Sequence, residues 1–186
     1  CSVNGALVFT SGNWMTAQDI TITAVNDSIA EGTHSCAVTN ASTSGDANYD
    51  GIAVASVNGT VTDNDTAGVN VVPTVSVAEG GATDTYSVVL TSQPIDDVTI
   101  TPTGDTQCTV SGALTFTALT WDTPQTVTVT AVDDDIAEGD QTCTVTHAYV
   151  SDDTNYEGIA VASVTGSITD NDGAGVSITP TNADIT

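Results

Sequence analysis

The sequence has no lysine and no arginine in 186 residues, whereas aspartate and glutamate together number 24, which gives a formal net charge of −24. Proteins that bind nucleic acid neutralise its phosphates with lysine and arginine, so nucleic acid is excluded as a partner. Attraction to an anionic lipid surface needs the same cations. Carboxylates that crowd together in this chain must therefore face solvent, take up protons or bind metal ions.

Aromatic residues and long apolar runs are also scarce. Aromatic residues make up 4% of the chain, and no apolar run approaches the roughly 20 residues of a membrane-spanning helix, so we expect no direct membrane insertion. No signal peptide is visible, and the chain begins with Cys1 rather than methionine, so we interpret it as a piece of a longer protein. Disorder is the competing interpretation of such a charged chain. The hydrophobic content of 39% and the alternating segments described below favour a folded protein.

The four cysteines form two equally spaced pairs. Cys1 and Cys36 are 35 residues apart, and so are Cys108 and Cys143. A regular, even cysteine count in an acidic, threonine-rich chain indicates disulfides formed in an oxidising compartment, here outside the cell or at its surface. Four cysteines allow three connectivities, and the spacing favours Cys1–Cys36 and Cys108–Cys143. Each bridge is worth roughly 3–4 kcal/mol in the chain-entropy model.

An internal repeat determines the predicted domain organisation. CSVNGALVFT (1–10) matches CTVSGALTFT (108–117), and NYDGIAVASVNGTVTDNDTAGV (48–69) matches NYEGIAVASVTGSITDNDGAGV (155–176), both with an offset of 107 residues. This period is too long for a solenoid coil and fits one whole β-sandwich domain. We therefore predict a complete sandwich at 67–172. Residues 1–66 are then the later part of a preceding repeat, and 173–186 are the first strand of a following one.

The strand pattern of the complete repeat predicts an all-β fold. Residues 126–132 (TVTVTAV) alternate strictly, with Val127, Val129 and Ala131 on one face. Turn-forming residues separate about seven such segments, and no segment has a helical period. The expected strands are 69–77, 83–90, 98–103, 113–116, 126–132, 142–150 and 161–169. Phe116, Trp121, Tyr86 and Tyr156 are expected in the core and at its corners. The predicted class is a tandem array of antiparallel β-sandwiches.

Three acidic clusters follow predicted strands. They are Glu79-Gly80-Gly81, the run from Asp133 to Asp140 (DDDIAEGD), and Asp170-Asn171-Asp172. Aspartate, asparagine and glycine are common turn formers, which explains single residues. Three consecutive aspartates without a nearby cation repel one another, and this favours metal binding. Calcium takes six to eight oxygen ligands from flexible loops, so Ca²⁺ is the expected ion.

These clusters carry a family resemblance over essentially the whole chain. The order VSVAEG (75–80), PQTVTVTAVDDDIAEGD (124–140), Tyr156-Glu157-Gly158 and ITDNDGAGV (168–176) resembles the Calx-β type of domain, which occurs in sodium–calcium exchangers and in large bacterial surface proteins. The resemblance implies an immunoglobulin-like sandwich that binds calcium at one end. The implied ligands are Glu79, Asp134, the carbonyl of Ile136, Glu138, Asp170 and Asp172, with Asp133, Asp135 and Asp140 as further candidates.

The chain departs from the calcium-sensing members of this family at two places. Gln107 and Cys108 stand where those members carry an acid, and Asn171 replaces the middle acid of the last cluster, which favours one or two ions. The first repeat is poorer in acids, with Asp27, Glu31, Asp63 and Asp65 as its weaker site. The counterpart of Glu79 would precede residue 1. We therefore expect the second site to bind calcium more tightly.

No catalytic constellation is present, so we expect no enzyme. His34 and His147 do not occupy equivalent positions, and no nucleophile, zinc-protease or phosphate-loop motif occurs. The leading hypothesis is an extracellular stalk, adhesin spacer or matrix module whose partners are neighbouring repeats of the same protein. One alternative is a subunit of a self-assembling filament, in which residues 176–181 add a strand to the first sandwich of a neighbour. Another alternative is a calcium-sensing regulatory module.

Overall fold

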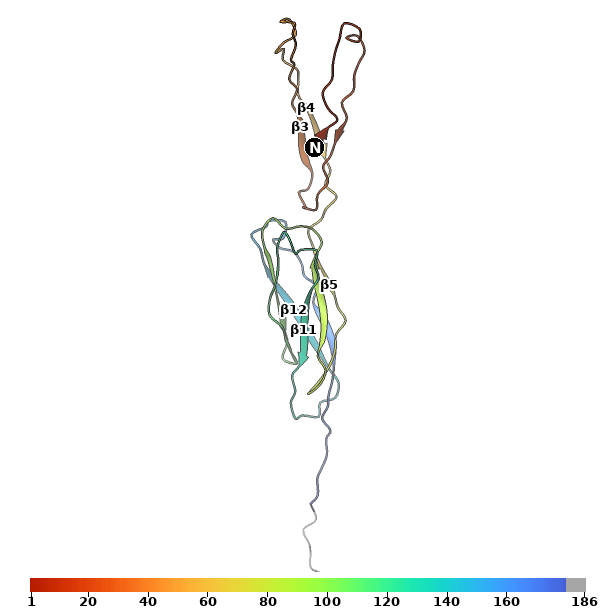
Figure 1. The fold of residues 1–186 in the computed structure, drawn as a ribbon. Coiled ribbons are helices and arrows are strands. Elements are labelled where there is room, and N and C mark those ends of the chain that lie inside the picture. The colour runs from red at the N-terminus through yellow and green to blue at the C-terminus, as the bar shows by residue number, and fades with distance from the viewer. Residues whose placement is uncertain (180–186) are drawn as a thin grey trace, which may run out of the picture. The chain divides into compact units, whose positions relative to one another are not determined.

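The structure is a computed structural model, and it describes residues 1–179. The chain folds into two compact units, which divide between Thr66 and Ala67. Figure 1 shows the course of the chain. The fold is all-β, and the described residues contain no helix. Within them, therefore, no helix is long and apolar enough to cross a membrane.

Unit 1, Cys1–Thr66, has four short strands in two separate two-stranded sheets. The strands are β1 (Ser2–Val3), β2 (Ile22–Thr23), β3 (His34–Val38) and β4 (Val57–Val61). β1 pairs with β2, and β3 pairs with β4, both antiparallel. Among the described residues of this unit, the buried apolar side chains are Ala30 and Cys36. Unit 1 therefore has strands but almost no core.

Unit 2, which begins at Ala67, has two sheets around one hydrophobic core. One sheet has the order β10-β8-β12-β13-β6, and the other has the order β5-β7-β11-β9. The strands are β5 (Val69–Val72), β6 (Ser76–Ala78), β7 (Asp84–Leu90), β8 (Val98–Gly104), β9 (Cys108–Val110), β10 (Leu114–Phe116), β11 (Gln125–Ala131), β12 (Gln141–Val150) and β13 (Val164–Thr169). This is a two-layer β-sandwich.

Side-chain alternation explains how the core is filled. Val127, Val129 and Ala131 of β11 are buried, as the sequence alternation predicts. From the opposite sheet, Ile100, Val145 and Ile168 supply buried side chains. Burying each such side chain is worth about 1.5–3 kcal/mol, so this shared core accounts for most of the favourable free energy of folding of unit 2.

Two predictions about the strands are wrong in detail. The expected single strand 69–77 is broken, because β5 pairs with β7 in one sheet and β6 pairs with β13 in the other. Pro73 lies between β5 and β6, and it has no N–H to continue a ladder. The second error concerns strand direction. We expected an antiparallel sandwich, but β6 and β13 pair in parallel, whereas the remaining described pairs are antiparallel. The short strand β9 was not expected at all.

The two disulfides join the cysteines that the repeat spacing pairs. Cys1 is bonded to Cys36, and Cys108 is bonded to Cys143. In unit 2 this bond connects β9 of one sheet with β12 of the other. The disulfide therefore links the two layers of the sandwich covalently.

Several buried polar groups form hydrogen bonds with residues that are distant in the sequence. The hydroxyl of Tyr156 donates to the carbonyl of Ser92 at 2.5 Å, and the pKa of Tyr156 is raised, mainly because the side chain is buried. The hydroxyl of Tyr86 lies 2.7 Å from Nε2 of His147, and burial raises the pKa of Tyr86 to about 12 and lowers the pKa of His147. Tyr86 is in β7 and His147 is in β12, so this contact joins the two sheets, while Nδ1 of His147 is buried without a hydrogen-bond partner. Tyr86, Phe116 and Tyr156 are buried in the core of unit 2, and the half-buried Trp121 packs against it, as expected.

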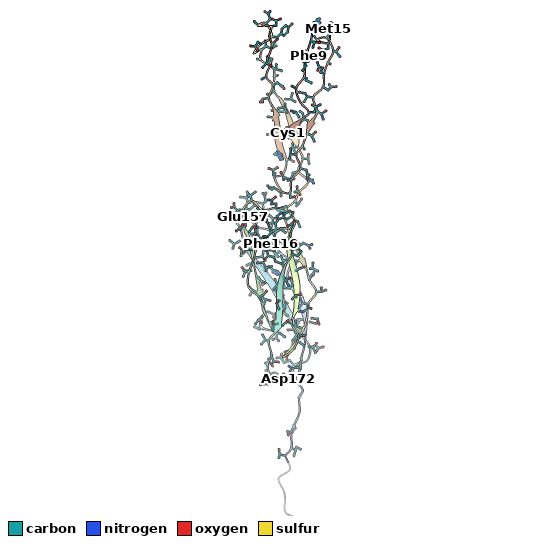
Figure 2. All side chains as sticks on the ribbon, in the orientation of Figure 1. Cys1, Phe9, Met15, Phe116, Glu157 and Asp172 are labelled. Atoms are coloured by element: carbon teal, nitrogen blue, oxygen red, sulfur yellow. A yellow bond between two sulfur atoms is a disulfide. The ribbon has the colours of Figure 1, made fainter. Side chains whose placement is uncertain are left out.

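Equivalent phenylalanines of the two units have opposite environments, and this difference is testable. Phe116 is 0% exposed in unit 2, whereas Phe9, its counterpart at the repeat offset, is 57% exposed in unit 1 (Figure 2). Phe116→Ala should destabilise unit 2 by about 3–5 kcal/mol, because it removes a fully buried ring and leaves a cavity. Phe9→Ala should change the stability of the chain by less than about 0.5 kcal/mol. Urea unfolding followed by near-ultraviolet circular dichroism measures both, and equal effects would contradict this description of the two units.

Candidate metal site

The end of β13 carries the first carboxylates of the candidate site. β13 ends at Thr169, and Asp170 then accepts two main-chain hydrogen bonds, from the N–H of Asp172 at 2.7 Å and from the N–H of Gly139 at 2.6 Å. These bonds bend the chain after the strand and attach it to the loop that follows β11. They also lower the pKa of Asp170, so its carboxylate stays ionised.

The parallel pairing of β6 with β13 brings Glu79 to the same place. Ala78, the last residue of β6, is opposite Thr169, and the N–H of Glu79 donates to the carbonyl of Thr169 at 3.1 Å. As a result, carboxylate oxygens of Glu79, Asp170 and Asp172 all lie within 4.8 Å of one another. Glu79 thus joins two aspartates that lie about 90 residues further along the chain in one cluster.

Two of the three carboxylates each have one buried oxygen without a hydrogen-bond partner. Oε2 of Glu79 and Oδ2 of Asp172 have no solvent exposure and no hydrogen-bond partner. Glu79 as a whole is 9% exposed. Burial raises the pKa of Glu79, and the nearby Asp170, Asp134 and Asp172 raise it further. The pKa of Asp172 is raised by burial and then by Asp170 and the aspartates at 133–135. An unpaired buried carboxylate is costly, and a cation placed between these oxygens would remove that cost.

The loop that follows β11 adds more acids around the cluster. Oδ1 of Asp134 accepts a bond from the N–H of Ile136 at 2.8 Å. Oδ1 of Asp133 accepts a bond from the side-chain amide of Asn171 at 3.0 Å. A Cβ atom at Gly80 would lie 2.8 Å from that amide and 3.0 Å from Asp133, and Gly80 has a φ of +57°, so the position requires glycine.

The predicted ligands therefore divide into two groups. Glu79, Asp170 and Asp172 are mutually close, and Asp133, Asp134 and Asp135 are near enough to raise the pKa of Asp172. The side chains of Glu138 and Asp140 are exposed and do not belong to the close cluster, and the side chain of Ile136 is 59% exposed. The residues that are present fit a calcium ion, because carboxylates together with loop carbonyls are the oxygen donors that calcium takes.

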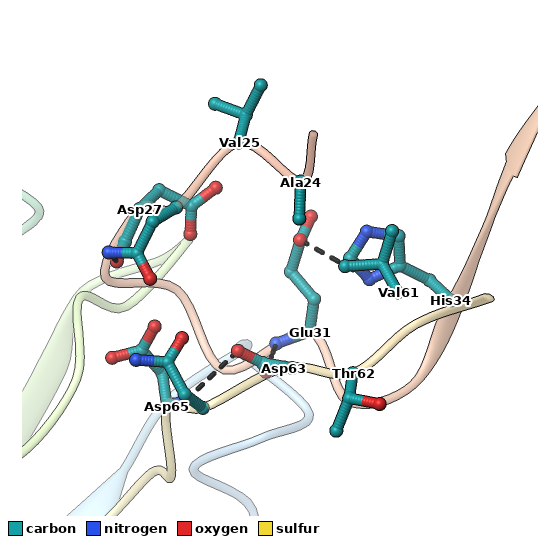
Figure 3. A pocket seen from close by; sticks show the side chains of 11 residues that line it. Ala24, Val25, Asp27, Glu31, His34, Val61, Thr62, Asp63 and Asp65 are labelled. Carbon is teal, nitrogen blue, oxygen red and sulfur yellow. Dashed lines mark hydrogen bonds and ion pairs between the residues drawn. The ribbon is translucent and has the colours of Figure 1, made fainter. Parts of the chain in front are cut away.

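The first unit has a related arrangement with fewer acids. Asp63 accepts main-chain bonds from Glu31 at 2.7 Å, from Gly32 at 2.8 Å and from Asp65 at 3.0 Å, and these bonds lower its pKa (Figure 3). Asp63 thus repeats the role of Asp170. The pocket around it is also lined by Asp27, and a carboxylate oxygen of Glu31 lies 3.6 Å from Nδ1 of His34. No described residue of unit 1 takes the place of Glu79, because that position precedes residue 1 at the repeat offset.

A second group of potential ligands, Asp105 with Cys108 and Cys143, is a structural feature. Both sulfur atoms are in the disulfide, so neither is a thiolate that could bind a metal. Asp105 accepts bonds from the N–H of Gln107 at 3.0 Å and from the N–H of Thr144 at 2.7 Å. Its carboxylate fixes the turn that leads into β9.

The sequence places Gly80 and Asn171 within the acidic clusters, but their roles were not predicted. Asn171 was treated as a lost ligand, whereas it fixes Asp133 by a hydrogen bond across 38 residues of sequence. The glycine that follows Glu79 was a visible signal, since a glycine directly after a predicted ligand often marks a tight turn. The partner of Asn171 had no local signal.

No family model matches the chain, and no curated protein matches it. Among solved structures, the chain is similar to a structure titled "Crystal structure of Apo-form Calx CBD1 domain", with a TM-score of 0.41 and 18% sequence identity. The match covers 56% of this chain and 98% of that chain.

Removing the charge of Glu79 should stabilise the metal-free protein. Glu79→Gln keeps the shape of the side chain and removes a buried carboxylate that neighbouring acids repel. In chelator at neutral pH, the midpoint of thermal unfolding of unit 2 should rise by a few degrees. Glu157→Gln is the matched control, because Glu157 is exposed, and it should leave the midpoint unchanged. A fall in the midpoint of the Glu79→Gln variant in chelator would show that the carboxylate is stabilised by contacts within the protein.

Proposed function

We propose that this chain is part of an extracellular structural protein, built from tandem immunoglobulin-like repeats that bind calcium. The carboxylate cluster of Glu79, Asp170 and Asp172, with its two buried and unpaired oxygens, is the observation that supports calcium binding most directly. The two disulfides support an oxidising, extracellular location.

The proposed calcium ligands come from three separate loops of unit 2. Glu79 follows β6, Asp170 and Asp172 follow β13, and Asp134 lies in the loop after β11. A bound ion would hold the three loops together and neutralise their mutual repulsion. The carbonyl of Ile136 and the side chains of Asp133, Asp135, Glu138 and Asp140 are further proposed ligands. In this proposal the bound ion holds loops in place and takes part in no reaction, so the role of the site is structural.

The motif Asp-Asn-Asp also determines where the ion would act along the chain. In unit 1 this motif is 63–65, and unit 2 begins two residues later, at Ala67. An ion bound at Asp63 and Asp65 would sit directly before the connection between repeats and restrict its bending. We propose that calcium stiffens the array in this way, so that the protein acts as a spacer, stalk or matrix element rather than as an enzyme.

Calcium should raise the thermal stability of unit 2 through this site. At free calcium one hundred times above Kd, the ion contributes about 2.7 kcal/mol, which raises the unfolding midpoint of a domain of this size by roughly 10 °C. Differential scanning calorimetry of the whole chain in calcium and then in excess chelator measures the shift. The Glu79→Gln variant should lose most of the shift, and Glu157→Gln should keep it. If calcium leaves the midpoint unchanged, the acidic clusters are solvated turns and the proposed function fails.

Stiffening should be visible in solution. If calcium restricts bending after Asp65, small-angle scattering of the whole chain should give a narrower distribution of the largest interatomic distances in calcium than in chelator. Asp63→Asn together with Asp65→Asn should remove the difference while unit 2 keeps its calcium-dependent stability. Identical scattering under both conditions would exclude stiffening without excluding calcium binding.

A further inference from the structure

Unit 1 exposes the face that unit 2 uses as its core. At the repeat offset of 107 residues, Ile22 corresponds to Val129, Val57 to Val164, and Tyr49 to Tyr156. The residues of unit 2 are 0%, 1% and 1% exposed, whereas their counterparts in unit 1 are 39%, 51% and 61% exposed. Apolar side chains that fill a core in one unit and are exposed in the other indicate that unit 1 lacks the layer that would cover them.

The strands of unit 1 show which partner is missing. β1, β2, β3 and β4 correspond at the same offset to β9, β11, β12 and β13 of unit 2. In unit 2, β11 also pairs with β7, β12 with β8, and β13 with β6. The paired residues correspond in unit 1 to 18–22, 38–43 and 60–62, at and beyond the ends of β2, β3 and β4, and on these edges no partner strand is described. Each open edge therefore lacks one strand from the segment that holds β5 to β8.

Gly59 provides an independent indication of the same partner. Its counterpart, Gly166, is a position where an added Cβ would lie 2.9 Å from the side chain of Val75, which packs directly over it. At Gly59 an added Cβ would meet only the carbonyl of Cys36, at 4.0 Å. A hollow lined by Ile22, Cys36 and Gly59, among others, occupies this side of unit 1. Glycine at position 59 leaves room for a valine that unit 1 does not contain.

We propose that the open face of unit 1 binds a polypeptide segment of the same type as residues 67–107, the first four strands of another copy of the repeat. Its β7-like strand pairs with residues 18–22, its β8-like strand with 38–43 and its β6-like strand with 60–62, by the register of unit 2. Its inward side chains, equivalent to Val75, Val88 and Ile100, cover Ile22, Val57 and the hollow at Gly59. The glutamate equivalent to Glu79 then reaches Asp63 and Asp65.

The last part of the chain does not fit this face. Residues 176–179 correspond at the repeat offset to 69–72, which is β5. β5 pairs with β7 and with no strand that has a counterpart in unit 1. The described residues 173–179 form no strand, and residues 180 and 181 of the expected donor strand lie outside the described residues. Addition of 176–181 alone to the first sandwich of a neighbour is therefore not supported, because the bridging β7-like strand would be absent.

The test uses the whole chain with a copy of residues 67–107 fused directly before Cys1, in a Trp121→Phe background. Trp14, which is 65% exposed, is then the single tryptophan. In chelator, the extension should lower acrylamide quenching of Trp14 at least about twofold, because the ring becomes less exposed. It should also slow amide exchange at residues 18–22 and 38–43 at least about tenfold, because these are the counterparts of the residues that pair with β7 and β8 in unit 2. An extension whose copies of Val88 and Ile100 are both aspartate keeps the length and should give neither effect.

Two results would overturn the proposal. One is an extended chain with the same quenching and the same amide exchange as the unextended chain. The other is an unextended chain that sediments as a dimer with Trp14 protected, because the face would then be an interface between two copies of unit 1. Since these measurements are made in chelator, they do not depend on calcium binding.

A further variant links the open face to the proposed calcium site, and this part rests on the proposed function. The extended chain should bind calcium at the first site at least about tenfold more tightly than the unextended chain, because it gains a carboxylate ligand. Glu79→Gln within the fused copy should abolish the gain in affinity and keep the protection of Trp14. Protection without any gain in affinity would leave the docking intact and contradict the calcium site alone.

Discussion

Main-chain amides take the role that lysine and arginine play in other proteins, and much of the structure depends on this substitution. Asp63, Asp84, Asp105, Asp153 and Asp170 each accept hydrogen bonds from at least two backbone N–H groups. Such bonds stabilise the ionised carboxylate, which is why the pKa values of Asp63, Asp84 and Asp170 are lowered. Asp153 is 1% exposed, yet its oxygens are satisfied by the N–H groups of Ile95 and Asn155. Glu79 and Asp172 differ from these aspartates, because one buried carboxylate oxygen of each has no hydrogen-bond donor.

Sequence patterns predicted the individual strands better than their pairing. The alternation in 126–132 identified the buried face of β11 correctly, because side chains on a strand point to opposite faces in turn. The split at Pro73 and the parallel pair of β6 with β13 were not predicted, because pairing depends on contacts between residues about 90 positions apart in sequence. The alternation of apolar and polar residues along one strand does not show which strand pairs with it or in which direction.

The candidate site was predictable to a similar extent. Glycine and acidic residues after predicted strands pointed to Glu79, Asp170 and Asp172, and the structure places these three together. The exposed positions of Glu138 and Asp140 were not predictable, because the main-chain bond from Gly139 to Asp170 orients that part of the loop. Unit 1 shows the limit of reasoning from a repeat. Nearly identical sequence motifs give an exposed face there and a core in unit 2, because a core needs both of its layers.

The disulfide of unit 2 has a mechanical consequence. Cys108 and Cys143 are 35 residues apart and belong to strands of different layers. If the chain were pulled from its two ends, tension would pass through the sulfur–sulfur bond, and the segment between the cysteines would bear none of it. At about 3.4 Å per residue, the segment between the cysteines would span roughly 120 Å when extended, and the disulfide prevents this part of the chain from extending. Each repeat of this kind would therefore lengthen under load by the unfolding of its first four strands, of β12 beyond Cys143 and of β13, while the cross-linked middle stays short.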